Sequence, residues 1–172
     1  MKKIGIITLI LLSCACSTTV AKDSVEEYLN KFKNHDQEVM QSLEQLIVYE
    51  NLSEKDQELY RLIMRKQYQD LKFKTVQEYY NGDHALITEE IEVYDYKKSR
   101  QRASQYYNEH ASTLTNEEYQ RLQLEYMYQE KSRTKYTINF ELAYEDEHWK
   151  LISPDYTVLQ KIHGIYAGEG DT

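Results

Sequence analysis

An Asn-Gly pair between two alternating runs of residues constrains the fold of this chain more than any other feature. Residues alternate in character from 72 to 79, a second run extends over 84–96, and Asn81-Gly82-Asp83 lies between them. Such a pair is a strong short-range signal of a β-hairpin, because Asn and Gly both accept the positive φ that a tight turn needs. The sequence therefore predicts two antiparallel strands here.

A second hairpin is predicted in the C-terminal third of the chain. The acidic run Glu145-Asp146-Glu147 forms its turn, and Trp149 and Leu151 lie on the returning strand. The residues that share one face of the first strand are Ile138, Phe140, Leu142 and Tyr144.

Ser153-Pro154 then begins a last helix, since proline suits the first helical position, and Gly164 ends it.

Helical spacing fills the rest of the chain. Three helices are predicted ahead of the first hairpin. A capping box of Ser24 and Glu27 opens the first, Asn34-His35-Asp36 separates it from the second, and Ser53 caps the third. A polar helix over 98–110 is predicted to follow the first hairpin.

The segment over 116–131 fits two structures. Thr115 and Glu118 form a capping box ahead of a run of good helix formers, which favours a helix. The alternating positions Leu122, Leu124, Tyr126 and Tyr128 fit a strand instead. We favour the helix because the capping box and the helix formers agree, and the strand stays open as the alternative.

The first residues of the chain indicate export from the cytoplasm. Lys2 and Lys3 precede an apolar run over 4–13 and small residues at a cleavage point, which is the pattern of an export signal. The run is too short to span a bilayer, since a spanning helix needs about 20 apolar residues.

The end of this run resembles the lipobox of bacterial lipoproteins. Leu11 lies three residues before Cys14, and Ser13 lies directly before it. The resemblance implies that cleavage precedes Cys14 and that its thiol is diacylated, which anchors the protein in the membrane. Cys16 is a competing site, but Ser13 fits its −3 position less well than Leu11 fits that of Cys14.

These boundaries divide the chain into a signal peptide over 1–13, a lipidated tether over 14–22, one domain over 23–166 and a flexible tail over 167–172. Both cysteines lie ahead of the domain, so no disulfide can form within it. None of the 29 acidic residues lies in the signal peptide, and removing its two lysines leaves the mature chain at a net charge of −10. Such a charge argues against nucleic acid as a partner.

The order of elements resembles small Gram-positive lipoproteins with a nuclear-transport-factor-2-like (cystatin-like) domain. The matching pieces are the lipobox, the words Ala85-Leu86-Ile87 and Val93-Tyr94-Asp95-Tyr96, and the segment over 136–151 with its acidic turn. The resemblance implies an α+β cone, in which N-terminal, central and C-terminal helices wrap a curved antiparallel sheet of about four strands. It implies a pocket between sheet and helices but no particular reaction.

Glu89 is the sharpest single candidate for a functional residue. Strict alternation places it with Ile87 and Ile91 on the apolar face, where burial would raise its pKa and suit it to act as a general base. Tyr79 or Tyr144 could then be its partner. The alternative is a bulge at Glu89-Glu90 that turns the carboxylate toward water, because buried unpaired acids are rare.

Tyr94 and Tyr96 are the candidate ligand-binding tyrosines, because they are expected to share a strand face. The chain has 17 tyrosines, which either line a binding surface or simply do the packing work of phenylalanine. The basic run from Lys97 to Arg102 is expected to pair with neighbouring carboxylates rather than with a ligand. The five histidines are scattered singly, so we expect no metal site and no cofactor.

The sequence thus predicts a lipoprotein on the extracytoplasmic face of the cell membrane, acting as a non-enzymatic binding module. Its partners would be the membrane, through the lipid at Cys14, and a small ligand or a protein, with a homodimer left open. The alternative is a small pocket enzyme of the hydratase or isomerase type, with Glu89 as its general base.

Overall fold

The computed structural model describes residues 20–110 and 113–168. The predicted signal peptide, Cys14, most of the tether and the last four residues of the tail lie outside the described residues. The elements, in chain order, are α1 (Ala21–Lys33), α2 (Gln37–Tyr49), α3 (Glu54–Gln69), β1 (Lys72–Asn81), β2 (His84–Tyr94), α4 (Tyr96–His110), α5 (Asn116–Gln129), β3 (Arg133–Glu145), β4 (His148–Leu151) and α6 (Tyr156–Ile162).

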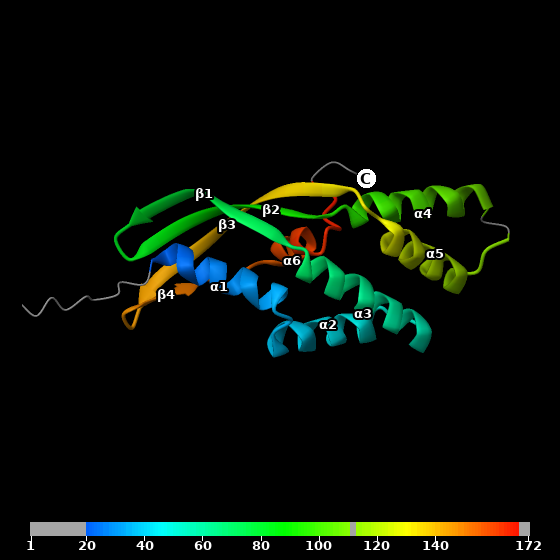
Figure 1. Ribbon diagram of the computed structural model, residues 1–172, viewed down its shortest axis with the longest axis horizontal. Coiled ribbons are helices and arrows are strands. Elements are labelled where there is room, and N and C mark those ends of the chain that lie inside the picture. Colours follow the sequence, from blue (N-terminus) through cyan, green and yellow to red (C-terminus); the bar gives the residue numbers. More distant parts are fainter. Residues whose placement is uncertain (1–19, 111–112, 169–172) are drawn as a thin grey trace, which may run out of the picture.

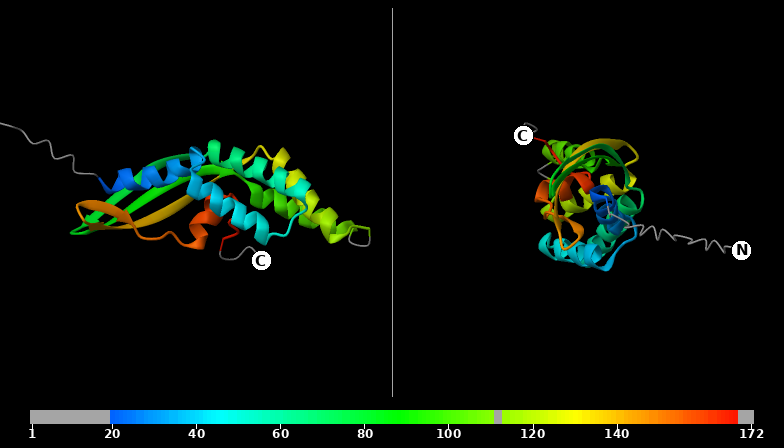
Figure 2. Two further views of the ribbon diagram at one scale, coloured as in Figure 1. Left: turned by 90° about the horizontal axis from the view of Figure 1, so that it is seen from below. Right: turned by 90° about the vertical axis from the view of Figure 1, so that its left-hand side faces the viewer.

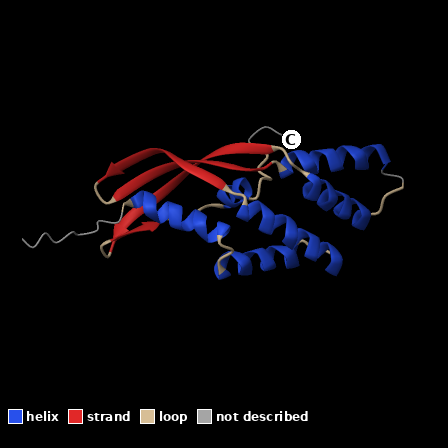
Figure 3. Cartoon of the chain, in the orientation of Figure 1, coloured by secondary structure: helices blue, strands red, loops and turns tan. Residues whose placement is uncertain are grey.

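An open antiparallel sheet of four strands, in the order β1-β2-β3-β4, confirms both predicted hairpins. Gly82 takes a φ of 63° in the first turn, and Asp146 and Glu147 take 53° and 65° in the second. Pairing of β2 with β3 joins the two hairpins along their full lengths. The architecture is therefore α+β, in an elongated molecule in which α1 lies against the sheet and α2 to α5 extend beyond one end of it (Figures 1 and 3).

The two faces of the sheet differ in chemistry. On the outer face, Glu92 pairs with Lys72 at 2.7 Å, and Glu90 pairs with Lys74 at 3.1 Å and with Lys135 at 3.0 Å. The inner face is apolar and packs against α1, which contacts β1, β2 and β4. Figure 2 shows the sheet curving over this helix. The buried α1 residues recur at helical spacing: Ala21, Val25, Leu29 and Phe32.

The remaining helices extend the molecule beyond the end of the sheet. Helices α4 and α5 form an antiparallel pair that packs on α3 (Figure 1). The segment with two interpretations is a helix, and both hydrogen bonds of the Thr115–Glu118 capping box are formed. The ion pair between Arg121 and Asp56, at 3.1 Å, links α5 to α3.

Three local predictions are wrong in detail. Helix α1 begins at Ala21 with Val20 at its N-cap and no side-chain cap, so Ser24 lies inside the helix, where its hydroxyl donates to the Trp149 carbonyl of β4 at 2.9 Å. Asp155, rather than the Ser153-Pro154 pair, caps α6, so the proline lies ahead of the helix. Helix α4 starts at Tyr96, which ends β2 two residues earlier than expected.

Gly164 ends α6, as predicted, and also allows a close approach between distant segments. Its φ is +71°, and a Cβ at this position would overlap the carbonyl oxygen of Tyr94 at the end of β2. The Gly164 carbonyl accepts from the Lys97 amide at 2.8 Å, and Gln67 of α3 bonds to both backbone groups of Tyr94. The end of α6 is thereby fixed against the junction of β2 and α4.

Candidate functional site

Glu89 lies on the inner, apolar face of the sheet. It and its neighbours on that face of β2, Ile87 and Ile91, are fully buried, with 0% of each residue exposed. The alternative of a bulge that turns Glu89 to solvent is wrong, because the register shift of this hairpin lies on β1, between Thr75 and Gln77.

Only one oxygen of the Glu89 carboxyl group has a partner. The Thr75 hydroxyl donates to Oε1 at 2.5 Å, and Oε2 has no hydrogen-bond partner among the described residues. The expected partners, Tyr79 and Tyr144, are instead 57% and 42% exposed. Burial raises the pKa of the Glu89 carboxyl group, and the hydrogen bond from Thr75 opposes this rise only in part.

Glu89 lies away from the cavities of the described residues in which a substrate could bind. A general base must come within hydrogen-bond reach of the proton that it removes. Five cavities among the described residues are large enough to hold a small molecule, and Glu89 lines none of them. Its strand is covered on this face by α1. The geometry therefore gives no support to a hydratase or isomerase that uses Glu89.

Tyr94 and Tyr96 do not share a strand face. Tyr94 is the last residue of β2 and Tyr96 the first of α4, although their rings stack at 6.0 Å. Tyr96 is buried, and its hydroxyl donates to a backbone carbonyl. The Tyr94 ring lies between the cations of Lys66 and Arg133, at 4.5 and 4.4 Å from its centre, and its hydroxyl donates to Asp70. Both tyrosines thus stabilise the fold.

The best-enclosed cavity lies elsewhere, between α2, α3 and α6. Its volume is about 660 Å³, within the range of roughly 300–1,000 Å³ that is typical of small-molecule sites. We call it the helical cavity. The apolar and aromatic residues that line it are Tyr28, Phe32, Val39, Leu43, Leu46, Tyr60, Tyr68, Tyr156, Leu159 and Ile165. Most of these side chains come from α2, α3 and α6, which meet on the side of the molecule away from the outer face of the sheet (Figures 1 and 2).

A buried hydrogen-bonded pair lies in the wall of the helical cavity. The Tyr68 hydroxyl and Nε2 of His163 are 2.9 Å apart, and the two residues are 1% and 9% exposed. Burial lowers the pKa of His163 to about 4 and raises that of Tyr68. Both groups are therefore neutral near pH 7, and they offer hydrogen bonds without charge.

Charged residues lie at two places around the helical cavity. Lys31 of α1 pairs with Glu38 of α2 at 3.2 Å. Glu50 and Arg100 also line the cavity, near the hydroxyl of Tyr60. Burial, with Glu50 adding to it, raises the pKa of Tyr60 to about 12, while Arg100 opposes the rise. Tyr60 therefore presents a neutral hydroxyl near the carboxylate of Glu50 and the guanidinium group of Arg100.

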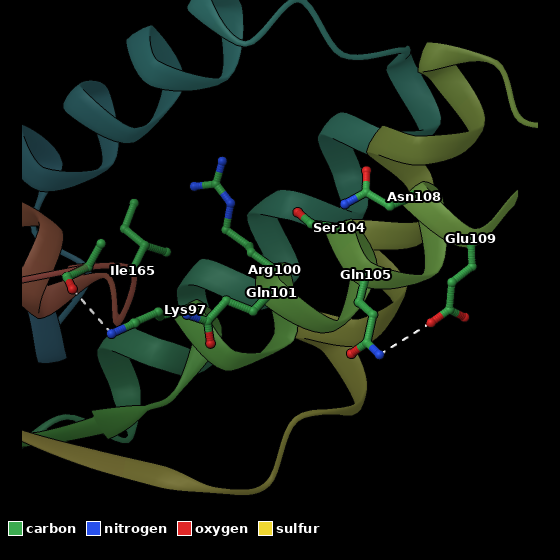
Figure 4. A pocket seen from close by; sticks show the side chains of 9 residues that line it. Lys97, Arg100, Gln101, Ser104, Gln105, Asn108, Glu109 and Ile165 are labelled. Atoms are coloured by element: carbon green, nitrogen blue, oxygen red, sulfur yellow. Dashed lines mark hydrogen bonds between the residues drawn. The ribbon is translucent and has the colours of Figure 1, made fainter. Parts of the chain in front are cut away.

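A second cavity lies along α4, and most of the residues that line it are of polar types. Its volume is about 690 Å³, and we call it the polar groove. Figure 4 shows its lining side chains projecting from α4, with Ile165 at one end. The amide of Gln105 donates to Glu109 at 3.3 Å, and the Lys97 ammonium group donates to the Ala167 carbonyl at 3.2 Å.

The expectation that the basic run pairs with carboxylates is wrong for three of its members, since the side chains of Lys98, Arg100 and Arg102 have no carboxylate partner within residues 20–110 and 113–168. Arg102 lies over the ring of Tyr126, with the guanidinium carbon 4.7 Å from the ring centre. Arg100 has neither a hydrogen bond nor an ion pair with any residue in 20–110 or 113–168. Arg100 thus lies beside both cavities as a cation without an ionic partner in the described part of the chain.

Sequence reasoning missed the helical cavity. His163 counted only as one of several scattered histidines near an element end. A signal was available, because His163 follows Leu159 by four residues and so lies on the same face of the last helix. Nothing in the sequence, however, places Tyr68 opposite His163, since 95 residues separate them.

No candidate metal centre emerges from the described part of the chain. Nowhere in it do three or more His, Cys, Asp or Glu side chains gather so that they could hold a metal ion. Within the same residues, no helix combines the length and hydrophobicity that crossing a membrane requires.

Comparisons with known proteins assign this chain to no family. No protein-family model and no curated protein matches the sequence. One solved structure with a similar backbone is that of a "putative lipoprotein" from Bacillus subtilis, at 14% identity and a TM-score of 0.41. The match covers 81% of this chain and 46% of that one, so the chain spans less than half of its length. A likeness this low carries no argument about function.

Proposed function

We propose that this protein is a lipid-anchored, extracytoplasmic binding module whose helical cavity holds a small, largely apolar ligand. The observation that carries the proposal is the cavity itself, a space of about 660 Å³ lined mainly by aliphatic and aromatic side chains. Apolar walls with a few convergent polar groups are typical of ligand sites. Of the expected partners, the proposal includes the small ligand and the membrane.

The buried pair in the cavity wall favours binding over acid–base chemistry. With a pKa of about 4, His163 is neutral at pH 7 and far from the value that suits a general base at that pH. Tyr68 holds its Nε2 atom in a hydrogen bond. The pair can orient a ligand by hydrogen bonding, and burying it costs no ionic desolvation.

The sequence supports the anchor and the fold family that complete the proposal. The words Leu11-Leu12-Ser13-Cys14 resemble a lipobox, and two acyl chains on Cys14 would suffice for stable attachment to a membrane. We extend the proposal to the cystatin-like cone of such lipoproteins, because three helices, a hairpin, a helical pair, a hairpin and a last helix follow in that order.

The binding proposal is tested with residues 14–172 carrying Cys14→Ser, which retain every described residue without the lipid. We expect a neutral fluorescent probe, N-phenyl-1-naphthylamine, to bind once per chain. Leu46→Trp should block binding because Leu46 lines the helical cavity. Val48→Trp on the same helix should not, because Val48 is 75% exposed and does not line it. Equal binding by both variants, or no binding by the parent chain, contradicts the proposal.

The anchor is tested separately in the full chain. Cys14→Ser should abolish the incorporation of radiolabelled palmitate and release the protein from the membrane fraction. Cys16→Ser is the matched control and should leave both unchanged. Label that persists on Cys14→Ser but disappears in Cys16→Ser would move the lipid to the competing site, and label on neither parent nor variants would refute the anchor.

A further inference from the structure

The helical cavity and the polar groove are neighbours. Arg100 and Ile165 line both of them. The backbone hydrogen bond from Lys97 to Gly164 holds the segment after α6 against the first turn of α4, which brings these two residues together. A single elongated molecule could therefore occupy both spaces and pass Arg100 and Ile165 where they meet.

The residue types that line the two spaces differ. Ten of the residues that line the helical cavity are aliphatic or aromatic. The polar groove is lined mainly by amides, a hydroxyl and charged groups, which Figure 4 shows along α4: Gln101, Ser104, Gln105, Asn108 and Glu109. A ligand that matches both has an apolar part in the first and a polar part at the second.

Arg100 gives the junction a positive charge that pairs with no carboxylate of residues 20–110 and 113–168. Its guanidinium group has no hydrogen bond or ion pair within the described residues. The nearby charged residues that line either cavity are Glu50 on the helical side, and Lys97 and Glu109 on the polar side. A guanidinium group binds carboxylate and phosphate groups in a bidentate manner, so an anion is the chemical partner that Arg100 lacks.

We infer that the ligand is an amphiphile with an anionic head group, whose apolar tail fills the helical cavity and whose carboxylate or phosphate binds Arg100. This inference rests on the proposed binding function and specifies its ligand. An apolar cavity alone would prefer the least polar of several amphiphiles of equal length, because binding strength then follows the apolar area buried. A preference for a charged head group would therefore indicate that Arg100 binds it.

The experiment measures displacement of N-phenyl-1-naphthylamine from residues 14–172 with Cys14→Ser. The competitors are dodecanoate, dodecyl phosphate and dodecanol, each below its aggregation concentration. In the parent chain, at least one anion should compete at about tenfold lower concentration than the alcohol, since one charge-assisted hydrogen bond is worth about that factor. Comparing the two anions shows which head group the site takes.

Arg100→Gln should abolish the preference for the anions over dodecanol, with each competitor measured relative to the variant's own affinity for the probe. Lys98→Gln is the matched control, because it removes the same charge from the same helix and Lys98 lines neither cavity. The inference is refuted if dodecanol competes as well as both anions, or if the preference survives Arg100→Gln. Failure of the probe itself to bind would instead refute the proposed function.

Discussion

Replacing Glu89 with methionine should stabilise the protein. The carboxyl group lies among apolar side chains with 0% exposure, and its Oε2 atom has no hydrogen-bond partner among the described residues. Methionine has the same unbranched shape and no polar atom, and it adapts to irregular spaces. The substitution therefore removes a desolvated group without opening a cavity.

The magnitude follows from two opposing contributions. A buried oxygen without a hydrogen bond costs about 1–3 kcal/mol, and the net value of the bond from Thr75 is about 0.5–1.5 kcal/mol or somewhat more. Thr75 is only half-buried, so its hydroxyl can turn to water once Glu89 is replaced. We expect a net gain in the free energy of unfolding of about 1–2 kcal/mol at pH 8, or roughly 2–8 °C in Tm for a chain of this size.

The gain should depend on pH with a definite sign. The pKa of Glu89 is raised in the folded state, so the folded chain holds this proton at a pH where the unfolded chain has released it. The wild type therefore loses stability as pH rises from about 4.3, the value of an unfolded glutamate, through the folded pKa. Glu89→Met removes this loss, so its advantage should grow between pH 4 and pH 8.

Urea unfolding followed by circular dichroism at pH 4, 6 and 8 measures the effect. Glu90→Met is the matched control, because Glu90 lies next along β2 on the outer face and pairs with Lys74 and Lys135. Losing these exposed pairs should cost at most about 1 kcal/mol. A Glu89→Met variant that is less stable than the wild type at pH 8, or equally altered at every pH, would refute the reasoning.

Three further substitutions test other parts of the fold by the same unfolding measurement. Gly164→Ala should lower the free energy of unfolding by more than the roughly 1–2 kcal/mol that a non-glycine residue costs in a left-handed conformation, because its Cβ would overlap the Tyr94 carbonyl. Unchanged stability would contradict this close contact between Gly164 and Tyr94. Glu130→Gln should lower the free energy of unfolding by about 1–3 kcal/mol at pH 7. This loss should vanish as pH falls from about 4.3, the pKa of an unfolded glutamate, toward about 2, where the Glu130 carboxylate of the folded wild type is itself protonated. Tyr68→Phe should cost about 1–3 kcal/mol by leaving buried His163 without its partner, and a smaller loss would mean that water replaces the hydroxyl.

The strands were predictable because their signals are local. Asn81-Gly82 and the acidic turn at 145–147 each lie between alternating runs, which indicate the strands, although a register shift between Thr75 and Gln77 interrupts the alternation of β1. The helix that follows Thr115 was predictable for the same reason, since its capping box involves residues three positions apart. These features need no knowledge of the distant parts of the chain.

The errors occur where a distant residue competes for a local signal. Ser24 has the spacing of a cap, but its hydroxyl donates a hydrogen bond to the Trp149 carbonyl, which lies 125 positions away in the sequence. Tyr96 continues the alternation of the strand, but the chain turns into α4 at Asp95, whose amide bonds to Ser132. Local patterns cannot include such partners, because tertiary packing decides them.

The candidate site was beyond prediction for a related reason. The residues that line the helical cavity are scattered between positions 28 and 165, and only the packing of α2, α3 and α6 brings them together. The sequence did not single out Arg100, because a basic run in an acidic protein normally finds carboxylates. Which members of the run lack a carboxylate partner among the described residues, and which of these lines a cavity, follows only from the fold.

Two buried glutamates show how far a sequence can specify electrostatics. Glu89 and Glu130 are 0% and 7% exposed, yet the pKa of the first is raised and that of the second falls to about 2. Burial raises the pKa of both, but Glu130 accepts hydrogen bonds from Ser99, from the Lys131 amide, and from the amide and hydroxyl of Ser132, whereas Glu89 accepts one from Thr75. Alternation along a strand predicts which acid is buried. The supply of donors decides whether that acid stabilises the fold, so we expect Glu130 to act as an anchor and Glu89 as a point of weakness beneath α1.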